Sequence, residues 1–368
     1  MSLPDIDSLA AAINDPDSLA RLNLAQWDLL IRQARNADVL AKIAMRSERM
    51  GLFDRFPAQP RRHLQSAVRL ALRQMREVRS EVASIELALA PTQESFVLLK
   101  GAAYALAGLR SAEGRMMSDV DILVRKEALP FIESALMLHG WSSTARSAYD
   151  QRYYRAWMHE LPPMQHIHRA TTIDVHHAIL PVTSRSHPSS PALLSQAQPL
   201  SPGRRVCVLG PVDMFLHSAT HLFHEGEFQQ GFRGVVDLDS LLRELGVDEQ
   251  FWRQLVARAE ALELTRPLFY ALRYTRALLN TPIPEDALIA VSKSTGARQP
   301  GIGLSLMDAL FLRALRPAHA TTSDKWTPLA RWLLYVRGHW LRMPPLMLAV
   351  HLIRKSVMPK PKPEPQTP

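Results

Sequence analysis

Cysteine is nearly absent from this chain of 368 residues, since Cys207 is the only one. A single cysteine cannot form a disulfide within the chain, and it excludes a zinc site built from several thiolates. Apolar runs are also short: the stretch at residues 343–353 is interrupted by two prolines, whereas a membrane span needs about 20 apolar residues. Residues 1–7 are polar and acidic, unlike a secretory signal. We therefore expect a cytoplasmic protein.

Two common catalytic motifs are missing as well. The sequence has no phosphate loop of the Gly-x4-Gly-Lys type and no Gly-x-Ser-x-Gly turn. Cys207 lies in the apolar segment 205–209, where a thiol is a poor nucleophile. These features argue against a P-loop NTPase, a hydrolase with a nucleophilic serine elbow and a cysteine-dependent enzyme.

The chain is basic, with 44 Lys and Arg against 35 Asp and Glu and a net charge of +9. This balance suits an anionic partner such as a nucleotide, a nucleic acid or a membrane surface. Nucleic acid is the weaker hypothesis, because the arginines are scattered among carboxylates. Residues 326–355 mix aromatic and basic side chains, which is typical of an interfacial helix making peripheral contact with the inner membrane, or of a helical hairpin packed on the body.

Periodicity divides the chain into regions of different structure. Residues 5–90 have apolar residues at helical spacing, including one long helix over residues 61–88 with Leu64, Val68, Leu72 and Met75 on one stripe. From residue 95 the pattern alternates between short apolar strands and short helices. We expect strands at 96–99 and 119–124, helices at 101–107 and 127–139, a strand beginning at Trp141, and antiparallel strands over 149–180.

The second half of the chain is mainly helical. Residues 181–205 are rich in proline and serine and are predicted to be a loop, followed by a strand at 205–209. Helices are expected at 211–225, 231–245, 248–263, 265–279 and 303–315, and then as a C-terminal pair. The predicted fold class is α+β, with a small mixed sheet between two helical regions. The predicted boundaries are residues 1–92, 93–210 and 211–357, with a Pro-rich tail at 358–368.

Two aspartates one residue apart, Asp119 and Asp121, are the most informative feature. Residues i and i+2 of a strand point to the same face, so the two carboxylates project together while Val120, Ile122 and Val124 face a core. Paired carboxylates repel each other unless a cation lies between them. Mg2+ prefers oxygen ligands and bridges carboxylates to phosphates, so this pair predicts a Mg2+ site.

A third carboxylate and a Lys-Gly pair complete the candidate site. Asp174 lies in a strand-like segment in which Ile173 and Val175 face the core, so Asp174 and His176 share the opposite face. A third carboxylate next to a metal-binding pair is typical of sites that position phosphate and the attacking oxygen. Lys100-Gly101 begins the helix that follows the first strand, where glycine allows a phosphate to approach and lysine adds charge.

These motifs resemble the nucleotidyltransferase superfamily with the polymerase-β-like fold. The sequence is similar to an uncharacterised bacterial nucleotidyltransferase family in Leu99-Lys100-Gly101, in Arg115 before Ser118-Asp119-Val120-Asp121, and in Ile173-Asp174-Val175-His176. A segment from His221 to Arg233 and Asp237 belongs to the same likeness, which covers about residues 20–245. The fold implied is a nucleotidyltransferase core flanked by helical domains.

The resemblance implies a role for each of these positions. Asp119, Asp121 and Asp174 would be catalytic and would bind Mg2+, with Asp174 also able to activate the acceptor hydroxyl. The remaining residues, Lys100, Gly101, Arg115 and Ser118, would contact the nucleoside triphosphate. The implied reaction is transfer of a nucleoside monophosphate to a hydroxyl acceptor with release of pyrophosphate. The acceptor and the base of the nucleotide are left open.

Two observations keep alternatives open. Ala102 stands where the superfamily usually has Ser or Gly, so a degenerate module that binds a nucleotide or a protein, in envelope polysaccharide assembly at the membrane for example, remains a hypothesis. His217, His221 and His224 share a helix face and suggest zinc, but no further ligand is evident in the sequence, which favours a packing role between the core and the helical domain.

Overall fold

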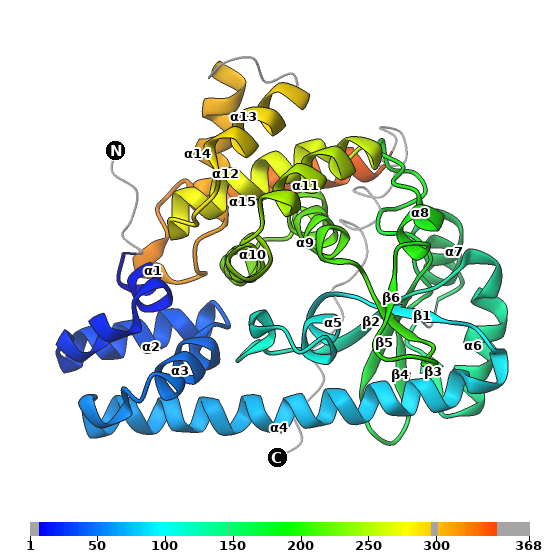
Figure 1. Cartoon of the computed structure of the whole chain (residues 1–368), viewed down its shortest axis with the longest axis horizontal. Coiled ribbons are helices and arrows are strands. Elements are labelled where there is room, and N and C mark those ends of the chain that lie inside the picture. The colour runs from blue at the N-terminus through cyan, green and yellow to red at the C-terminus, as the bar shows by residue number, and fades with distance from the viewer. Residues whose placement is uncertain (1–6, 146, 296–300, 344–368) are drawn as a thin grey trace.

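The structure is a computed structural model that describes residues 7–145, 147–295 and 301–343. Figure 1 shows a small sheet at one end of the molecule, the N-terminal helices at the other end, and the later helices packed over both. One long helix runs along the whole length and joins the two ends (Figure 1). The predicted fold class, a small mixed sheet with helical regions on both sides, is confirmed.

The helices of the described residues begin and end as follows: α1 (Asp7–Asn14), α2 (Leu24–Asn36), α3 (Leu40–Arg49), α4 (Ala58–Leu89), α5 (Lys100–Leu106), α6 (Leu129–Leu138), α7 (Ala148–Trp157), α8 (Ser190–Leu194), α9 (Pro211–Glu225), α10 (Gly231–Leu245), α11 (Glu249–Ala261), α12 (Thr265–Leu279), α13 (Glu285–Ser294), α14 (Ile302–Ala314) and α15 (Thr327–Arg342). Short 3-10 turns connect several of them, including η4 (Arg110–Ala112) between α5 and the second strand.

The strands form one mixed sheet. They are β1 (Phe96–Leu98), β2 (Asp119–Leu123), β3 (Trp141–Ser143), β4 (Met164–His166), β5 (Thr172–His176), β6 (Gln198–Pro199) and β7 (Val206–Val208). Their order is β3-β4-β5-β2-β1-β7-β6. The β1–β7 and β2–β5 pairs are parallel, and the other neighbours are antiparallel. The three residues of β1 are all buried, as expected for a central strand covered on both faces.

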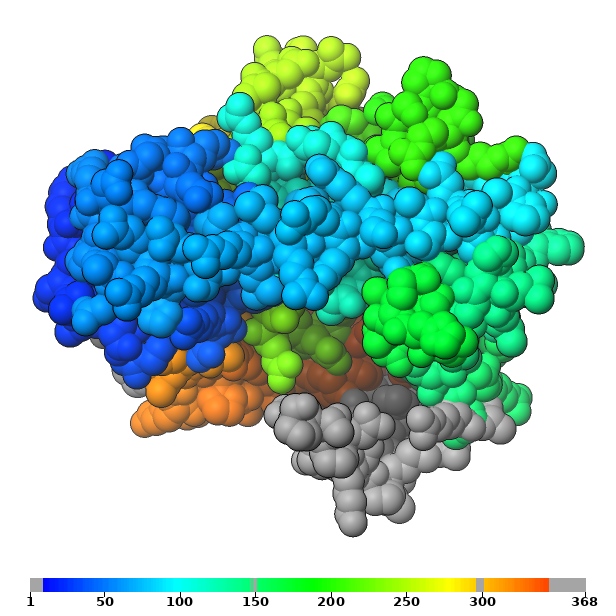
Figure 2. All heavy atoms as spheres, turned by 90° about the horizontal axis from the view of Figure 1, so that it is seen from below, coloured from blue at the N-terminus to red at the C-terminus, as the bar shows by residue number. Residues whose placement is uncertain are grey.

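The helix α4 fastens the sheet to the N-terminal helices. It is 32 residues long, about 48 Å at 1.5 Å per residue. Figure 2 shows it as a blue-to-cyan band across this face of the molecule. Glu81 of α4 is buried and accepts hydrogen bonds from Arg169 Nε at 2.8 Å and Thr171 Oγ1 at 2.7 Å. This contact holds the hairpin of β4 and β5, and so positions the strand that contains Asp174.

Several predicted elements differ from the structure. Residues 149–157 were predicted as strand, but they belong to α7, where Tyr153 and Trp157 pack edge-on one helical turn apart at 6.0 Å. Aromatic residues have strand propensity only where a sheet surface is there to receive them, and here they pack on each other. The antiparallel arrangement predicted within 149–180 is confirmed for β4 and β5, and β5 pairs on its other side with β2 in parallel.

Three smaller corrections concern helices and the proline-rich segment. The predicted loop at 181–205 contains α8 and β6, and α13 was not predicted. In α4, Leu64 and Val68 are buried as predicted, but Leu72 is 48% exposed. Leu72 lies eight residues after Leu64, and at about 100° per residue its side chain points about 80° away from that of Leu64. Ala71, seven residues after Leu64, lies on the buried face instead.

The buried apolar side chains form one continuous cluster from Leu9 in α1 to Leu334 in α15. The predicted domain boundaries at 92/93 and 210/211 therefore cross a shared core, and they remain predictions. No helix among the described residues is long and apolar enough to cross a membrane. Of the aromatic and basic segment 326–355, residues 344–355 lie outside the described residues, as does the tail 358–368.

Candidate active site

The sheet brings two of the predicted aspartates directly opposite each other. In the parallel pairing of β2 with β5, Asp121 is the partner of Asp174, and Asp119 is the partner of Thr172. Partners in register on adjacent strands have side chains on the same face. Val120, Ile173 and Val175 point to the other face and are buried, as predicted. Period-two alternation on both strands thus places the carboxylates together.

Asp121 is the most enclosed of the three carboxylates and is 3% exposed. Its Oδ1 accepts from Lys100 Nζ at 3.0 Å and from His176 Nε2 at 3.0 Å. Burial would raise the pKa of Asp121, but the positive charge of Lys100 and the hydrogen bond from His176 outweigh burial and hold it well below its usual range. Lys100 and His176 thus stabilise the ionised form of this buried carboxylate.

Asp174 differs, because its Oδ1 is buried and has no hydrogen-bond partner within the described part of the chain. Burial, reinforced by the charges of Asp121 and Glu160, raises the pKa of Asp174 to about 7. An unpartnered buried oxygen costs free energy in the absence of a ligand. Asp174 therefore has an oxygen free to bind a ligand, and its carboxyl group exchanges a proton near neutral pH.

Asp119 lies at the outer end of β2 and is partly exposed. Its Oδ1 accepts from Ser118 Oγ at 3.2 Å, and Ser118 itself is exposed. The three aspartates do not form a group whose ligand atoms all lie within 4.8 Å of one another in the described residues. Asp119 interacts with Asp174 and with Lys100 through charge only.

Lys100 adopts an unusual backbone conformation at the junction of β1 and α5. Its φ is +48°, in the left-handed region that costs a non-glycine residue about 1–2 kcal/mol. Leu99 N donates to the backbone oxygen of Asp121 at 3.0 Å, which fixes the junction to β2. Burial alone would lower the pKa of Lys100, but Asp121 and Glu225 raise it above its usual value.

Gly101 is explained by packing in this structure. A Cβ at this position would lie 2.1 Å from Arg115 Nη1 and 2.7 Å from Met117 Cγ. Arg115 in turn donates from Nε to Asp237 Oδ2 at 2.8 Å and lies over the ring of Tyr104. Contact of Gly101, Arg115 or Ser118 with a nucleotide remains a prediction.

The helix α9 forms the opposite wall of the site. His221 Nδ1 and Glu225 Oε1 are 2.5 Å apart on this helix. His217 is 5% exposed, and its pKa is held well below its usual value by burial first and then by Lys100. His224 points elsewhere: burial, with Arg337 and Arg342 of α15, lowers its pKa to about 4. The three histidines that suggested zinc are therefore divided between two environments.

The family comparison matches residues 23–280 to a model described as an uncharacterised nucleotidyltransferase. The match covers more than half of the chain, including β1, β2, β5, α9 and α10. The chain belongs to this nucleotidyltransferase family. It is accordingly a transferase, with an acceptor that the family does not specify. No curated protein and no solved structure matches the chain.

A small cavity of this nucleotidyltransferase adjoins Lys100, with a volume of about 240 Å³. Its lining comes from α5, the segment before β2, α9 and α10, and includes Lys100, Arg115, Arg233, Glu225, Glu227 and Asp237. Three cations thus face three carboxylates. Arg233 and Asp237 lie four residues apart on α10, but Arg233 Nη1 pairs with Asp38 and Asp237 pairs with Arg115.

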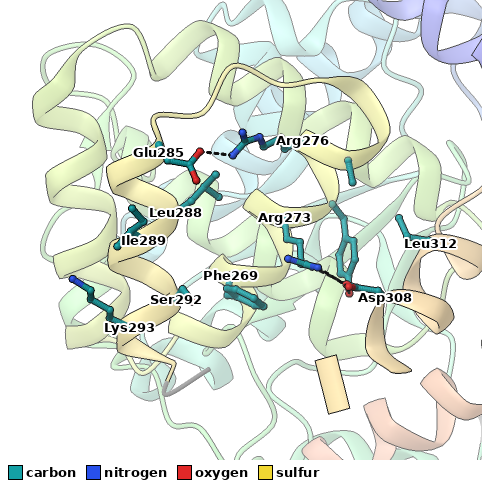
Figure 3. A pocket seen from close by; sticks show the side chains of 12 residues that line it. Phe269, Arg273, Arg276, Glu285, Leu288, Ile289, Ser292, Lys293, Asp308 and Leu312 are labelled. Carbon is teal, nitrogen blue, oxygen red and sulfur yellow. Dashed lines mark hydrogen bonds and ion pairs between the residues drawn. The ribbon is translucent and has the colours of Figure 1, made fainter. Parts of the chain in front are cut away.

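A larger cavity of about 700 Å³ lies between α12, α13 and α14 (Figure 3). Figure 3 shows that Arg273 is turned toward Asp308 and Arg276 toward Glu285, so both arginines of this cavity are paired. None of its lining residues belongs to the carboxylate site. Its size therefore does not make it the better candidate for the transfer chemistry.

Sequence analysis missed two residues that the structure brings to the site, His159 and Glu160. Glu160 pairs with His176 across an isolated antiparallel bridge, and its Oε2 lies 3.3 Å from His176 Nδ1. The sequence contains a possible signal for this cluster. Two pairs of polar residues, His159-Glu160 and His176-His177, each adjoin a buried apolar residue, Leu161 and Val175. His176, predicted to share a face with Asp174, contacts Asp121 directly.

Proposed function

We propose that the protein transfers a nucleoside monophosphate from a nucleoside triphosphate to a hydroxyl acceptor, with Mg2+ and with release of pyrophosphate. The observation that carries this proposal is the pairing of Asp121 with Asp174 in register on one face, with Asp174 Oδ1 buried and unpartnered among the described residues. A buried oxygen with a free position beside a second carboxylate fits a hard cation that takes oxygen ligands.

Asp121 and Asp174 would hold the metal, with Asp119 at the open end of the same strand. A bound Mg2+ neutralises charge on the phosphates and orients the attacking and leaving oxygens. Lys100 is the residue that must respond, because its ammonium now lies 3.0 Å from the Asp121 oxygen. With a dication held by Asp121, Lys100 would give up this contact and could turn to phosphate.

In the reaction, the acceptor oxygen forms a bond to the α-phosphorus. The bond from that phosphorus to the oxygen bridging to the β-phosphorus breaks, and pyrophosphate leaves with the electron pair. The acceptor proton passes to a base. Asp174 is a candidate for this base because it lies beside Asp121; its pKa of about 7 applies to the metal-free chain, and a bound cation would lower it.

The nucleotide would enter from the side of the cavity beside Lys100. Its 240 Å³ lies below the 300–1,000 Å³ of typical ligand pockets, so it accommodates part of a triphosphate rather than the whole molecule. Arg115 and Arg233 line it but are engaged with Asp237 and Asp38. They would contribute positive potential and keep their present partners.

A second candidate function is favoured by one observation. Lys100 and His176 already neutralise Asp121, which is the arrangement expected of a degenerate module that binds a nucleotide or protein without turnover. Nucleotide binding without pyrophosphate release, across a panel of hydroxyl acceptors, would favour this module. Peripheral membrane contact through residues 326–355 also stays a proposal, which co-sedimentation of the full chain with anionic vesicles would test.

Thermal unfolding with each nucleoside triphosphate, with and without Mg2+, tests the main proposal. A ligand that binds only the folded state at a hundred times its dissociation constant adds about 2.7 kcal/mol of stability. We expect one Mg2+-dependent shift in the wild type and none in Asp119→Asn. Asp119 is the suitable position, because among the described residues its side chain accepts a hydrogen bond from the exposed Ser118, and loss of that bond should leave the fold intact.

The matched control is Asp28→Asn, the same change at an exposed ion pair of α2. It should behave as the wild type in both nucleotide shift and transfer of α-phosphate label. If Asp119→Asn keeps the Mg2+-dependent shift and full transfer, the carboxylate site is not the site of the reaction.

A further inference from the structure

The short segment before β4 is fixed against β5 by its backbone. Leu161 N donates to Val175 O at 2.8 Å, and His177 N donates to His159 O at 2.8 Å. Between these bonds, Glu160 forms an isolated antiparallel bridge with His176. Backbone pairing thus places three potential metal ligands, His159, Glu160 and His176, at one location.

The donor atoms of these residues are close enough to share one ion. One ligand atom from each of the three lies within 4.8 Å of the other two, the one such group found among residues that the structure describes. His176 Nδ1 is 3.3 Å from Glu160 Oε2. Two ligands at 2.0–2.1 Å from a tetrahedral metal lie about 3.3 Å apart, so this pair already has the required separation.

His159 provides an independent indication. It is 8% exposed, and its Nδ1 is buried with no hydrogen-bond partner in the described ranges. Burial, and next the neighbouring His176, hold the pKa of His159 well below its usual range, so the ring is neutral. A buried neutral imidazole with an unused nitrogen is costly unless something binds it.

His176 is oriented as metal-binding histidines usually are. Its Nε2 lies 3.0 Å from Asp121 Oδ1, and because an ionised carboxylate only accepts, Nε2 carries the hydrogen. That assignment leaves Nδ1 to face Glu160. A carboxylate that accepts from the far nitrogen of a coordinating histidine fixes the ring and increases its basicity as a ligand.

We propose that His159, Glu160 and His176 bind one transition-metal dication of the Zn2+ type, at a site separate from the Asp121–Asp174 carboxylates. Two imidazoles and a carboxylate are the donor set of open zinc sites, and imidazole favours Zn2+ over Mg2+. His176 then connects the two sites, with its Nδ1 on this metal and its Nε2–H on Asp121. The site exists whether or not the chain transfers nucleotides.

The test uses the full chain, treated with a chelator and then titrated with Zn2+ in the absence of nucleotide. We expect about one Zn2+ retained per chain after desalting, and a visible absorption band when Co2+ replaces Zn2+ in a tetrahedral site. Stoichiometric binding should be lost in His159→Gln and in Glu160→Gln. Loss of the orienting carboxylate in Asp121→Asn should weaken binding by about 10–100-fold.

The matched control is His168→Gln, the same substitution at an exposed histidine between β4 and β5. It should bind Zn2+ as the wild type does. Asp119→Asn should also retain Zn2+ while losing nucleotide transfer, which separates failure of this site from failure of the proposed reaction. Thermal unfolding of each metal-free variant reports whether it is folded.

Two results would overturn the proposal. One is a wild-type chain that retains no Zn2+ after desalting, in which case Nδ1 of His176 simply shares a proton with Glu160. The other is equal Zn2+ binding by the wild type and by both folded variants, His159→Gln and Glu160→Gln, which would place the metal elsewhere.

Discussion

A single oxygen, Oδ1 of Asp121, connects most of the chemistry at the scale of residues. It accepts from Lys100 and from His176, each at 3.0 Å. Lys100 makes its contact from a left-handed backbone conformation. The free energy cost of that conformation must be offset by the surrounding structure, and such strained residues cluster at functional sites. The proposed Mg2+ at Asp121 would therefore compete with Lys100, whereas the proposed Zn2+ at His176 would be supported by the hydrogen bond from His176 to Asp121.

Asp174 gives a prediction about pH. Burial first, and then Asp121 and Glu160, raise its pKa from 3.8 to about 7 in the folded chain. Between these values the folded state binds more protons than the unfolded state, so this group makes the free energy of unfolding fall as pH rises from about 4 to 7. A shift of this size corresponds to at most about 4 kcal/mol at pH 8.

Asp174→Asn removes this dependence. Measured by urea denaturation in chelator, the stability of the variant relative to the wild type should increase between pH 4.5 and pH 8. Saturating Mg2+ should then stabilise the wild type at pH 8 and leave the variant unchanged. An identical pH dependence of stability in both proteins would show that Asp174 titrates normally.

The sequence contained part of this site. Alternation with period two predicted that Asp119, Asp121 and Asp174 share a face, and the register of β2 with β5 agrees for Asp121 and Asp174. It did not predict His159 and Glu160, because they lie in an irregular segment placed by a bridge to a distant residue. The sequence also did not predict that Arg115 pairs with Asp237 or that Arg233 pairs with Asp38, because each partner lies on a different element.

At the scale of elements, the end of α9 depends on α15. Gly226 ends α9 with φ +79°, and Arg342 Nη2 donates to the carbonyl of Glu225 at 2.7 Å. Arg337 Nη1 donates to Phe223 O at 3.1 Å. Arginines that satisfy the last carbonyls of a helix stabilise its C-terminus. Glu225, which lines the cavity beside Lys100, is therefore positioned from α15.

Gly338→Ala tests this junction. A Cβ at Gly338 would lie 2.7 Å from Glu225 O and 2.9 Å from Gly226 Cα, both backbone atoms that cannot rotate away. We expect a loss of about 1–3 kcal/mol in the free energy of unfolding, as for overpacked sites, together with weaker nucleotide binding. Urea denaturation and the nucleotide-induced thermal shift measure the two effects.

The control is Gly303→Ala, the same change in helix α14. A Cβ there meets no atom within 4 Å among the described residues, and alanine favours helix over glycine by up to about 1 kcal/mol. It should be neutral or stabilising. A Gly338→Ala protein as stable as this control would mean that α9 and α15 separate more easily than the structure implies.

Helix prediction succeeded where apolar periodicity was long and failed where local preference was weak. α9, α10 and α12 begin and end where predicted. Residues 149–157 belong to the region predicted as antiparallel strands, but they form part of α7, and the sheet on this side consists of β3, β4 and β5. Their local apolar pattern did not distinguish a short helix from a short strand.

At the scale of the whole molecule, the three predicted regions are held together by a buried group of charges. Asp237 of α10 accepts from Arg115 Nε at 2.8 Å, and Lys42 Nζ of α3 lies 3.9 Å from its other oxygen. Lys42 also donates to Ser111 O at 2.8 Å. Asp237 thus contacts both the N-terminal helices and the segment leading to β2.

This arrangement predicts that the described regions unfold together. Asn14 Nδ2 in α1 donates to Leu279 O in α12 at 2.9 Å, so the first and last helical regions also touch directly. The buried apolar cluster is continuous from Leu9 to Leu334, so separating one described region from the others would expose apolar surface to water. Far-UV circular dichroism and tryptophan fluorescence should give coincident urea transitions.

Asp237→Asn should move that single transition as a whole. Removing one partner from a buried ion pair costs about 3–5 kcal/mol, because Arg115 and Lys42 keep their charges in a buried place. Asp28→Asn, at a pair whose side chains are more than half exposed, should cost at most about 1 kcal/mol. Adding Lys42→Met to Asp237→Asn should recover part of the loss, since one uncompensated charge is removed. Two separate transitions in Asp237→Asn would instead mean that the predicted boundaries at 92/93 and 210/211 mark units that fold independently.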